Sequence, residues 1–115
     1  MNLAQVDFQQ LRIKHILYKS KVRSVLYGGT FDPNFFSASG PVSQWFSTIG
    51  LVRYNHNAHM QELYSIHQDI TSYALGLFDI YKRGKIDQAH DGLKTIERKS
   101  EQFLSILSQL ETAMA

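Results

Sequence analysis

The sequence lacks cysteine altogether, and this absence removes several functions at once. Without a thiol, the chain can form no disulfide, use no thiolate nucleophile and offer no sulfur ligand to a metal. It also has no run near the roughly 20 apolar residues that a membrane helix needs, so we expect no membrane insertion. Twelve Lys and Arg against ten Asp and Glu leave a formal net charge of +2, which predicts no nucleic-acid partner. We therefore expect a soluble, cytoplasmic domain.

Proline and glycine are concentrated in one stretch of the chain. Both prolines, Pro33 and Pro41, and four of the seven glycines lie between positions 28 and 50. Because these residues interrupt helices, they divide the chain into a helical start, an irregular insert of about 28–57 and a long remainder. A length of 115 residues suits one compact unit, so we interpret 1–115 as a single domain.

Apolar residues recur at steps of three and four in three long segments, which is the spacing of an amphipathic helix. These segments are the chain up to residue 26, 58–82 and about 86–111. A short helix is expected over about 41–49, because proline suits its first position. The pattern predicts an all-α fold, most simply an antiparallel four-helix bundle with an irregular insert that carries the short helix. Only 25–31 leaves room for a strand.

One motif looks catalytic. The segment Gly-Gly-Thr-Phe-Asp-Pro (28–33) resembles the signature of nucleotidylyltransferases, in which a strand precedes it and two histidines follow. Phe35 and Ala38 occupy the positions of those two histidines, so the catalytic charges are missing. We therefore predict that the chain is not an enzyme and that this segment is a helix end followed by an Asp-Pro turn.

Two histidines fall in the middle of core-facing stripes, His15 in the first helix and His67 in the second. Each must satisfy two ring nitrogens away from water, and a shared ion or a shared polar partner would do so. We therefore expect the two rings to converge on one spot inside the bundle. His56 and His59 lie at a loop-to-helix junction, where solvated histidines are the ordinary case.

The surroundings of these histidines resemble a known family. Lys-His-Ile-Leu-Tyr-Lys-Ser-Lys-Val occupies 14–22 and Gly-Pro-Val-Ser-Gln-Trp occupies 40–45, while His67 lies 22 residues beyond Trp45. The last helix carries a Glu-x-x-Ser pair at 97–100. In these features the chain resembles the chemoreceptor zinc-binding (CZB) domain, a bacterial all-α module of about this length.

The resemblance implies a zinc ion held by three histidines and a thiolate inside the bundle. His15 and His67 correspond to two of these ligands and are the candidate metal ligands here. Gly40 stands in place of the cysteine and Thr71 in place of the third histidine, and neither binds Zn²⁺ well. We expect no cofactor, with zinc as the alternative. Trp45 is expected to pack over this pocket and Thr71 to line it.

Two arrangements of the interior site stay open. In one, Asp69, His56 or His59 is recruited as a substitute ligand and zinc binds. In the other, which we favour, the pocket holds no metal and the histidines bond to hydroxyl groups, such as those of Thr71 or Ser100, or to a buried water.

Two functions are compatible with this pattern. The resemblance implies a non-enzymatic signalling or sensory domain that works in chemotaxis receptors and diguanylate cyclases, with protein partners or attached receptor and cyclase domains, and as a homodimer. The alternative is a structural interaction bundle, an adaptor or dimerisation module without metal. It would dock a partner through an exposed apolar surface, unless the aromatic residues of the insert cap the core instead. Those aromatic residues are Phe31, Phe35, Phe36, Trp45 and Phe46.

Overall fold

The computed structural model describes residues 2–114, and every regular element in that range is a helix. The all-α prediction is therefore confirmed, and 25–31 contains no strand. The helix expected over 58–82 is present with those bounds. The elements are α1 (Leu3–Leu26), α2 (Pro41–Trp45), a π-helical turn η1 (Phe46–Gly50), α3 (Leu51–Arg53), α4 (Ala58–Lys82), α5 (Ile86–Asp91) and α6 (Leu93–Ala113).

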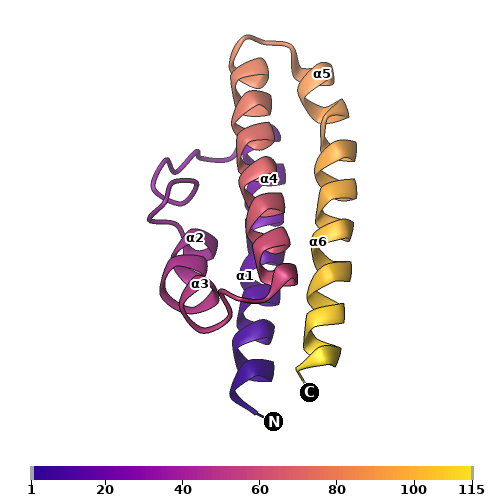
Figure 1. Cartoon of the computed structure of the whole chain (residues 1–115). Helices are drawn as coiled ribbons and strands as arrows, with labels where there is room; N and C mark the ends of the chain where they lie inside the picture. Colours follow the sequence, from indigo (N-terminus) through magenta and orange to yellow (C-terminus); the bar gives the residue numbers. More distant parts are fainter. Residues whose placement is uncertain (1, 115) are drawn as a thin grey trace.

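Three long helices form the body of the molecule, and the insert packs against one side of it (Figure 1). α1 and α4 run in the same direction because the insert carries the chain back between them, and α6 runs opposite to both. α1, α4 and α6 all contact one another, and α2 packs on α1. The two ends of the chain meet, since the Asn2 side-chain amide donates to the Met114 carbonyl at 3.2 Å.

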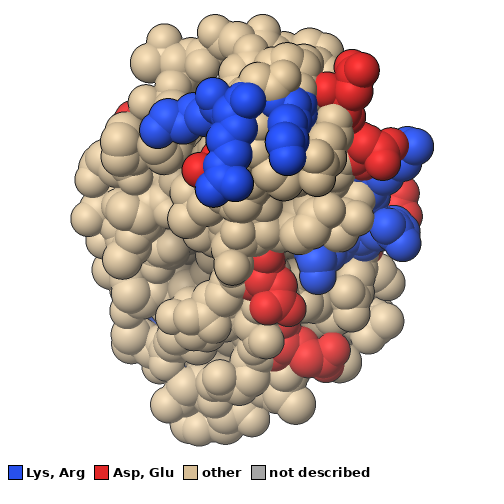
Figure 2. All heavy atoms as spheres, turned by 90° about the horizontal axis from the view of Figure 1, so that it is seen from above, with Lys and Arg blue, Asp and Glu red and all other residues tan. Residues whose placement is uncertain are grey.

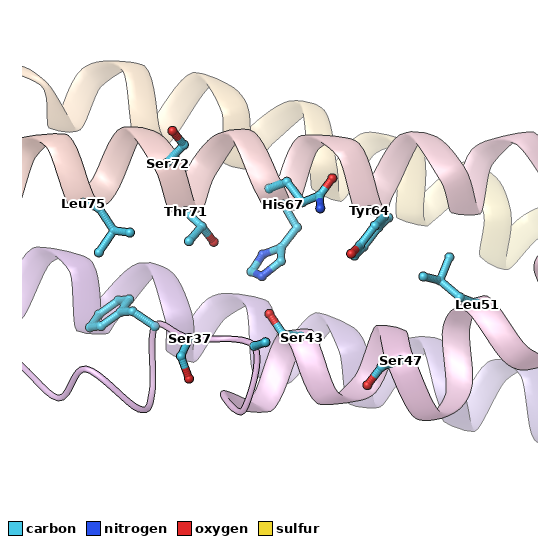
Figure 3. Close-up of a pocket in the computed structure, with 12 residues that line it drawn as sticks. Ser37, Ser43, Ser47, Leu51, Tyr64, His67, Thr71, Ser72 and Leu75 are labelled. Carbon is cyan, nitrogen blue, oxygen red and sulfur yellow. The ribbon is translucent and has the colours of Figure 1, made fainter.

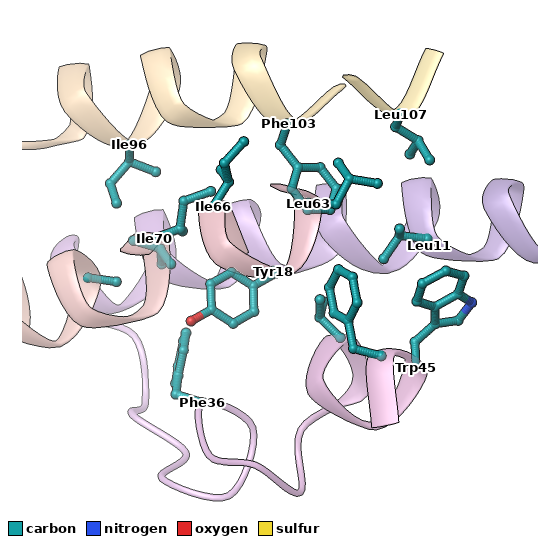
Figure 4. Close-up of a cluster of buried hydrophobic side chains, with 14 of the residues drawn as sticks. Leu11, Tyr18, Phe36, Trp45, Leu63, Ile66, Ile70, Ile96, Phe103 and Leu107 are labelled. Carbon is teal, nitrogen blue, oxygen red and sulfur yellow. The ribbon is translucent and has the colours of Figure 1, made fainter. Parts of the chain in front are cut away.

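The core runs along the axis between the three long helices and extends under the insert (Figure 4). Phe36, Trp45 and Phe46 of the insert are buried, whereas Phe31 keeps 41% of its surface exposed. Most of the insert aromatics therefore cap the core rather than form an exposed docking stripe. Burial of such large apolar side chains is the main force that holds the insert in place.

The motif that resembles a nucleotidylyltransferase signature is a helix end and a turn. α1 stops at Leu26, and Gly28 follows with φ +94°, a left-handed conformation that glycine adopts at no steric cost. Asp32 Oδ1 then accepts a hydrogen bond from the backbone N–H of Asn34 at 3.0 Å, which closes the turn. This local geometry matches the interpretation that we preferred from the sequence.

Two helix boundaries differ from the prediction. The helix expected over 86–111 is divided at Gly92 into α5 and α6. A Cβ atom at Gly92 would lie 2.3 Å from Leu77 Cδ2, so a larger residue there would force the Leu77 side chain of α4 to move. The short helical segment also continues past 49 to Arg53, through the π-helical turn.

Charges of both signs are interspersed on the end of the molecule seen in Figure 2. Ion pairs between residues close in sequence include Arg83 with Asp79 at the end of α4 and Lys94 of α6 with Asp91 of α5, both at 2.9 Å. Exposed pairs of this kind contribute little stability. Across residues 2–114, none of the helices combines the length and the apolar character needed to cross a membrane.

Candidate functional site

His15 lies in the interior on α1 and faces α6. Its side chain is almost fully buried, and its ring stacks on Phe103 with centroids 4.1 Å apart. Nε2 is 2.8 Å from the hydroxyl oxygen of Ser100, so this nitrogen has the hydroxyl partner that the sequence suggested. Nδ1 is buried and has no hydrogen-bond partner among the described residues.

His67 lies in the interior on α4, on the side that faces the insert. Its ring meets the edge of Tyr18 at a centroid distance of 5.0 Å and stacks on Phe46 at 5.8 Å. Residues 2–114 provide no hydrogen bond to either ring nitrogen, and Nδ1 is fully buried. An unpaired buried nitrogen of this kind costs about 1–3 kcal/mol.

The two imidazoles are electrostatic neighbours, but they have different partners. Burial, together with the nearby His67, Lys19 and Arg12, lowers the pKa of His15 to about 3. Burial alone lowers the pKa of His67 to about 4. Both rings are therefore uncharged at neutral pH, because each charged form would lose its hydration in the core.

A pocket of about 420 Å³ opens beside His67, between α4 and the insert (Figure 3). His67 and Thr71 extend into it from α4, and Ser43 faces them from α2. The twelve residues that line it include no Asp, Glu, Lys or Arg. Its walls are hydroxyl and amide groups beside apolar side chains, a composition typical of sites for small uncharged molecules.

The residues that the sequence assigned to this pocket are only partly together. Thr71 lines the pocket, and its Oγ1 is 2.8 Å from the Tyr18 hydroxyl. Trp45 does not line it: the indole is buried in the core against Phe46, at a centroid distance of 5.3 Å. His15 does not line it either, because its ring faces Ser100.

The donor groups present do not fit a closed tetrahedral zinc site. Across residues 2–114 no three His, Cys, Asp or Glu side chains are grouped closely enough to hold a metal ion. Of the possible substitute ligands, Asp69 and His56 are exposed to solvent, and His59 lies 3.6 Å from Glu62. At Gly40 a Cβ atom would lie 1.9 Å from the Phe35 carbonyl oxygen, so a side chain at the position of the family's cysteine would have no room.

The structure also contains a buried carboxylate, Asp7, that the sequence did not lead us to expect. Asp7 on α1 is 3% exposed and accepts hydrogen bonds from Arg53 at 2.8 and 3.0 Å and from the Tyr54 hydroxyl at 2.6 Å. Burial raises the pKa of Tyr54 to about 12, helped by its bond to Asp7. The signal was available, because Asp7 lies four residues before Leu11 on the inward face of the helix. This cluster attaches the end of the insert to α1.

The interior thus offers neutral hydrogen-bonding groups at a pocket, together with a charged attachment between the insert and α1. No protein-family model matches this chain, and no curated protein or solved structure matches it either. Its function must therefore be inferred from the residues described above.

Proposed function

We propose that this chain is a non-enzymatic bacterial signalling or sensory domain, similar to the CZB domain, whose histidine site is remodelled to work without zinc. One observation carries the proposal. His67 is a buried, neutral imidazole with both nitrogens unpaired among the described residues, and it borders a pocket of about 420 Å³. A small uncharged molecule that forms a hydrogen bond with the His67 ring would remove the cost of the unpaired nitrogen, and this would favour its binding.

In this proposal the segment from α2 to α3 takes the place of the fourth helix of an antiparallel bundle. It runs opposite to α1 and α4, as Figure 1 shows, and it packs on α1 through α2. It is much shorter than its neighbours, and the long loop before it, from 27 to 40, is held by aromatic side chains. The segment packs on the shared core through Val42, Trp45 and Phe46, and its short length and its loops on both sides suit it to shift as a unit against the long helices.

The proposed signal is a movement of this segment. The pocket separates the insert from α4, so a molecule bound at His67 would favour one spacing of the two. Asp7, Arg53 and Tyr54 join the end of the insert to α1, and a change in spacing would therefore be transmitted to that helix. A ligand shifts such an equilibrium only as far as it prefers one of the two arrangements. The domain would act in the cytoplasm on attached receptor or cyclase domains.

Metal analysis tests the remodelled site. Protein purified without chelator or added zinc should contain far less than one zinc per chain, and EDTA should leave its melting temperature unchanged. The same measurement on His15→Ala and His67→Ala provides the comparison. Stoichiometric zinc in the parent protein that both substitutions remove would contradict the proposal, because it would show a complete metal site.

Binding of neutral small molecules tests the pocket. Mixtures of uncharged amides, alcohols and heterocycles should shift the NMR signals of His67 and Thr71 in labelled protein. Ser43→Leu, which fills the pocket from α2, should abolish the shifts. Ser65→Leu provides the matched control, because Ser65 is exposed on α4 outside the pocket. The pocket proposal fails if no compound shifts these signals, or if the shifts persist in Ser43→Leu.

A second candidate function is an interaction bundle that needs no ligand. The aromatic residues of the insert give it no support, because Phe36, Trp45 and Phe46 are buried. Exposed aliphatic side chains on α1, such as Ile13 with 68% of its surface exposed, do favour it. The two functions are compatible, since a sensory domain also needs a surface that contacts its partner.

A further inference from the structure

α1 carries a second apolar stripe on its outward face. Its core-facing stripe is buried, yet five more large aliphatic residues of the same helix remain open to solvent. At 100° per residue they occupy about 140° of the helix surface, and from Leu3 to Leu17 they extend over about 21 Å. Their exposed fractions are 61% for Leu3, 37% for Val6, 68% for Ile13, 49% for Ile16 and 46% for Leu17.

Single exposed aliphatic residues are normal on a protein surface, but this set is different. Five of them share one face of one helix at the spacing i, i+3, i+10, i+13 and i+14. Anchors repeated at helical spacing are the pattern by which one helix packs against another. Exposed apolar surface gathered on one side of an element marks an interaction site, and here the exposed Gln9 and Gln10 separate its two parts. We call these five residues the outer stripe.

The charges beside the outer stripe are positive. Lys14 lies along one edge, Lys21 continues that edge one turn past Leu17, and Arg23 lies on the other edge six residues past Leu17. Lys21 also lies 5.9 Å from the Phe35 ring, and Arg23 lies 5.3 Å from the Tyr27 ring. Each of the three makes no ion pair with any residue between 2 and 114. Arg12 and Lys19 of the same helix are already bound to Glu111 and Glu97 of α6.

The helix has no free acid to balance these cations. Its one acidic residue, Asp7, is buried and bound to Arg53. The outer stripe is therefore an apolar surface with three cations that have no acidic partner among residues 2–114: Lys14 beside it, and Lys21 and Arg23 past its C-terminal end, one on the line of each edge. Its electrostatic complement is an apolar surface with negative charge on both edges.

We propose that the outer stripe of α1 docks an amphipathic partner helix whose apolar face is flanked by Asp or Glu. A second copy of this chain does not provide that complement. The one acidic residue of α1 is buried, so two outer stripes packed together in either direction would leave the cations of both copies without an acidic partner. A homodimer would therefore use another face.

An anionic membrane is also a poorer complement than a helix. Stable electrostatic attachment to lipid uses clusters of roughly four to eight basic residues, whereas three unpaired cations flank this stripe. The stripe is aliphatic, and the aromatic side chains that favour the lipid interface are absent from its five residues. The inference concerns α1 alone and stands whether or not the His67 pocket takes a ligand.

Two synthetic peptides test the inference on the full chain. Both are amphipathic helices of about 18 residues with a leucine face, a length that covers the stripe. One carries Glu along both edges of that face and the other carries Lys. We expect isothermal titration calorimetry to detect the Glu peptide with an affinity about tenfold or more above that of the Lys peptide, and high salt to weaken it.

Substitutions on α1 locate the binding surface. The double variant Ile13→Ser with Leu17→Ser should lower the affinity for the Glu peptide about tenfold or more, because it removes two of the apolar side chains that the peptide would contact. Lys14→Glu with Lys21→Glu should reverse the preference between the two peptides. Val52→Ser is the matched control, since Val52 is an aliphatic residue of α3 that is 65% exposed. Every variant should keep the urea midpoint of the parent protein, because these side chains lie outside the core.

Four results would overturn the inference. The first is that the Glu peptide does not bind, and the second is that both peptides bind equally well. The third is that Ile13→Ser with Leu17→Ser leaves the binding unchanged. The fourth is a different occupant. Self-association in the ultracentrifuge that this double variant abolishes would assign the stripe to a second copy, and binding to phosphatidylserine vesicles that it abolishes would assign it to a membrane.

Discussion

Acid should destabilise this protein mainly through its two buried histidines. The pKa of His15 falls from 6.5 to about 3 on folding and that of His67 falls from 6.5 to about 4, in both cases chiefly because burial disfavours the charged ring. Between these values and 6.5, the folded state binds fewer protons than the unfolded state. Stability therefore rises with pH in this window, and it is lost as the pH falls below about 6.5.

The size of the loss follows from the shifts. For one histidine whose pKa drops from 6.5 to about 4, the free energy of unfolding falls by about 2 kcal/mol between pH 8 and pH 5. His15 contributes a similar amount over the same interval, because its folded pKa is lower still. The two together remove about 4 kcal/mol. The free energy of unfolding of a whole domain is roughly 5–15 kcal/mol, so this loss is a large part of it.

Trp45 supplies the assay. It is the only tryptophan of the sequence and is 2% exposed, so its fluorescence should change when the core opens. Urea unfolding at pH 8, 7, 6 and 5 gives the free energy at each pH. His67→Gln, which replaces the imidazole with an amide that does not titrate, should remove about half of the difference between pH 8 and pH 5. His56→Gln removes an exposed histidine and should leave the difference close to that of the parent protein.

The reasoning is refuted if the parent protein loses less than about 1 kcal/mol between pH 8 and pH 5. It is also refuted if His56→Gln reduces the difference as much as His67→Gln does. Either result would mean that the imidazoles are hydrated in the folded protein and carry their charge there at little cost.

Two further predictions concern stability. Asp7→Asn should lower the free energy of unfolding by about 2–3 kcal/mol in urea unfolding, because it removes the charge that Arg53 binds; the partial exposure of Arg53 keeps the loss below that of a fully buried pair. Should the double variant with Arg53→Met be no more stable than the sum of the single losses predicts, the pair is not coupled. Gly92→Ala should lower the melting temperature, since its Cβ would meet Leu77, at a cost of about 1–3 kcal/mol. Gly76→Ala should raise the melting temperature, because a Cβ atom there meets nothing within 4 Å and alanine favours the helix. A lower melting temperature in both variants would contradict this reasoning.

The helices of this protein could be predicted because their signals are local. Leu11, Tyr18 and Val22 recur at steps that only a helix places on one face, and Gly28 and Gly84 end helices through their own left-handed conformation. The same spacing placed His15 and His67 in the interior without any knowledge of the neighbouring helices. The phase of each helix places the ring on an apolar stripe, and the packing of the neighbouring elements then buries it.

The details of the site could not be predicted in the same way. A helix phase says that His15 points inward, but it does not say that Ser100, 85 residues later, is the group that it meets. Asp7 and Arg53 are 46 residues apart, and their pairing depends on how the insert folds back on α1. The break at Gly92 was not predicted, and the Leu77 side chain that crowds the space beside it belongs to another helix.

The sequence by itself determined that the chain is helical, where its two longest helices end and which residues of each helix form an apolar stripe, because all three depend on neighbours a few residues away. Only the tertiary structure decided which apolar side chains of α1 are covered and which remain exposed. Phe8 and Ile13 are both strong apolar signals in one helix, yet the first is fully buried and the second is 68% exposed. The difference arises because α4, α6 and the insert cover one side of α1, and no local pattern records which side neighbouring elements will occupy.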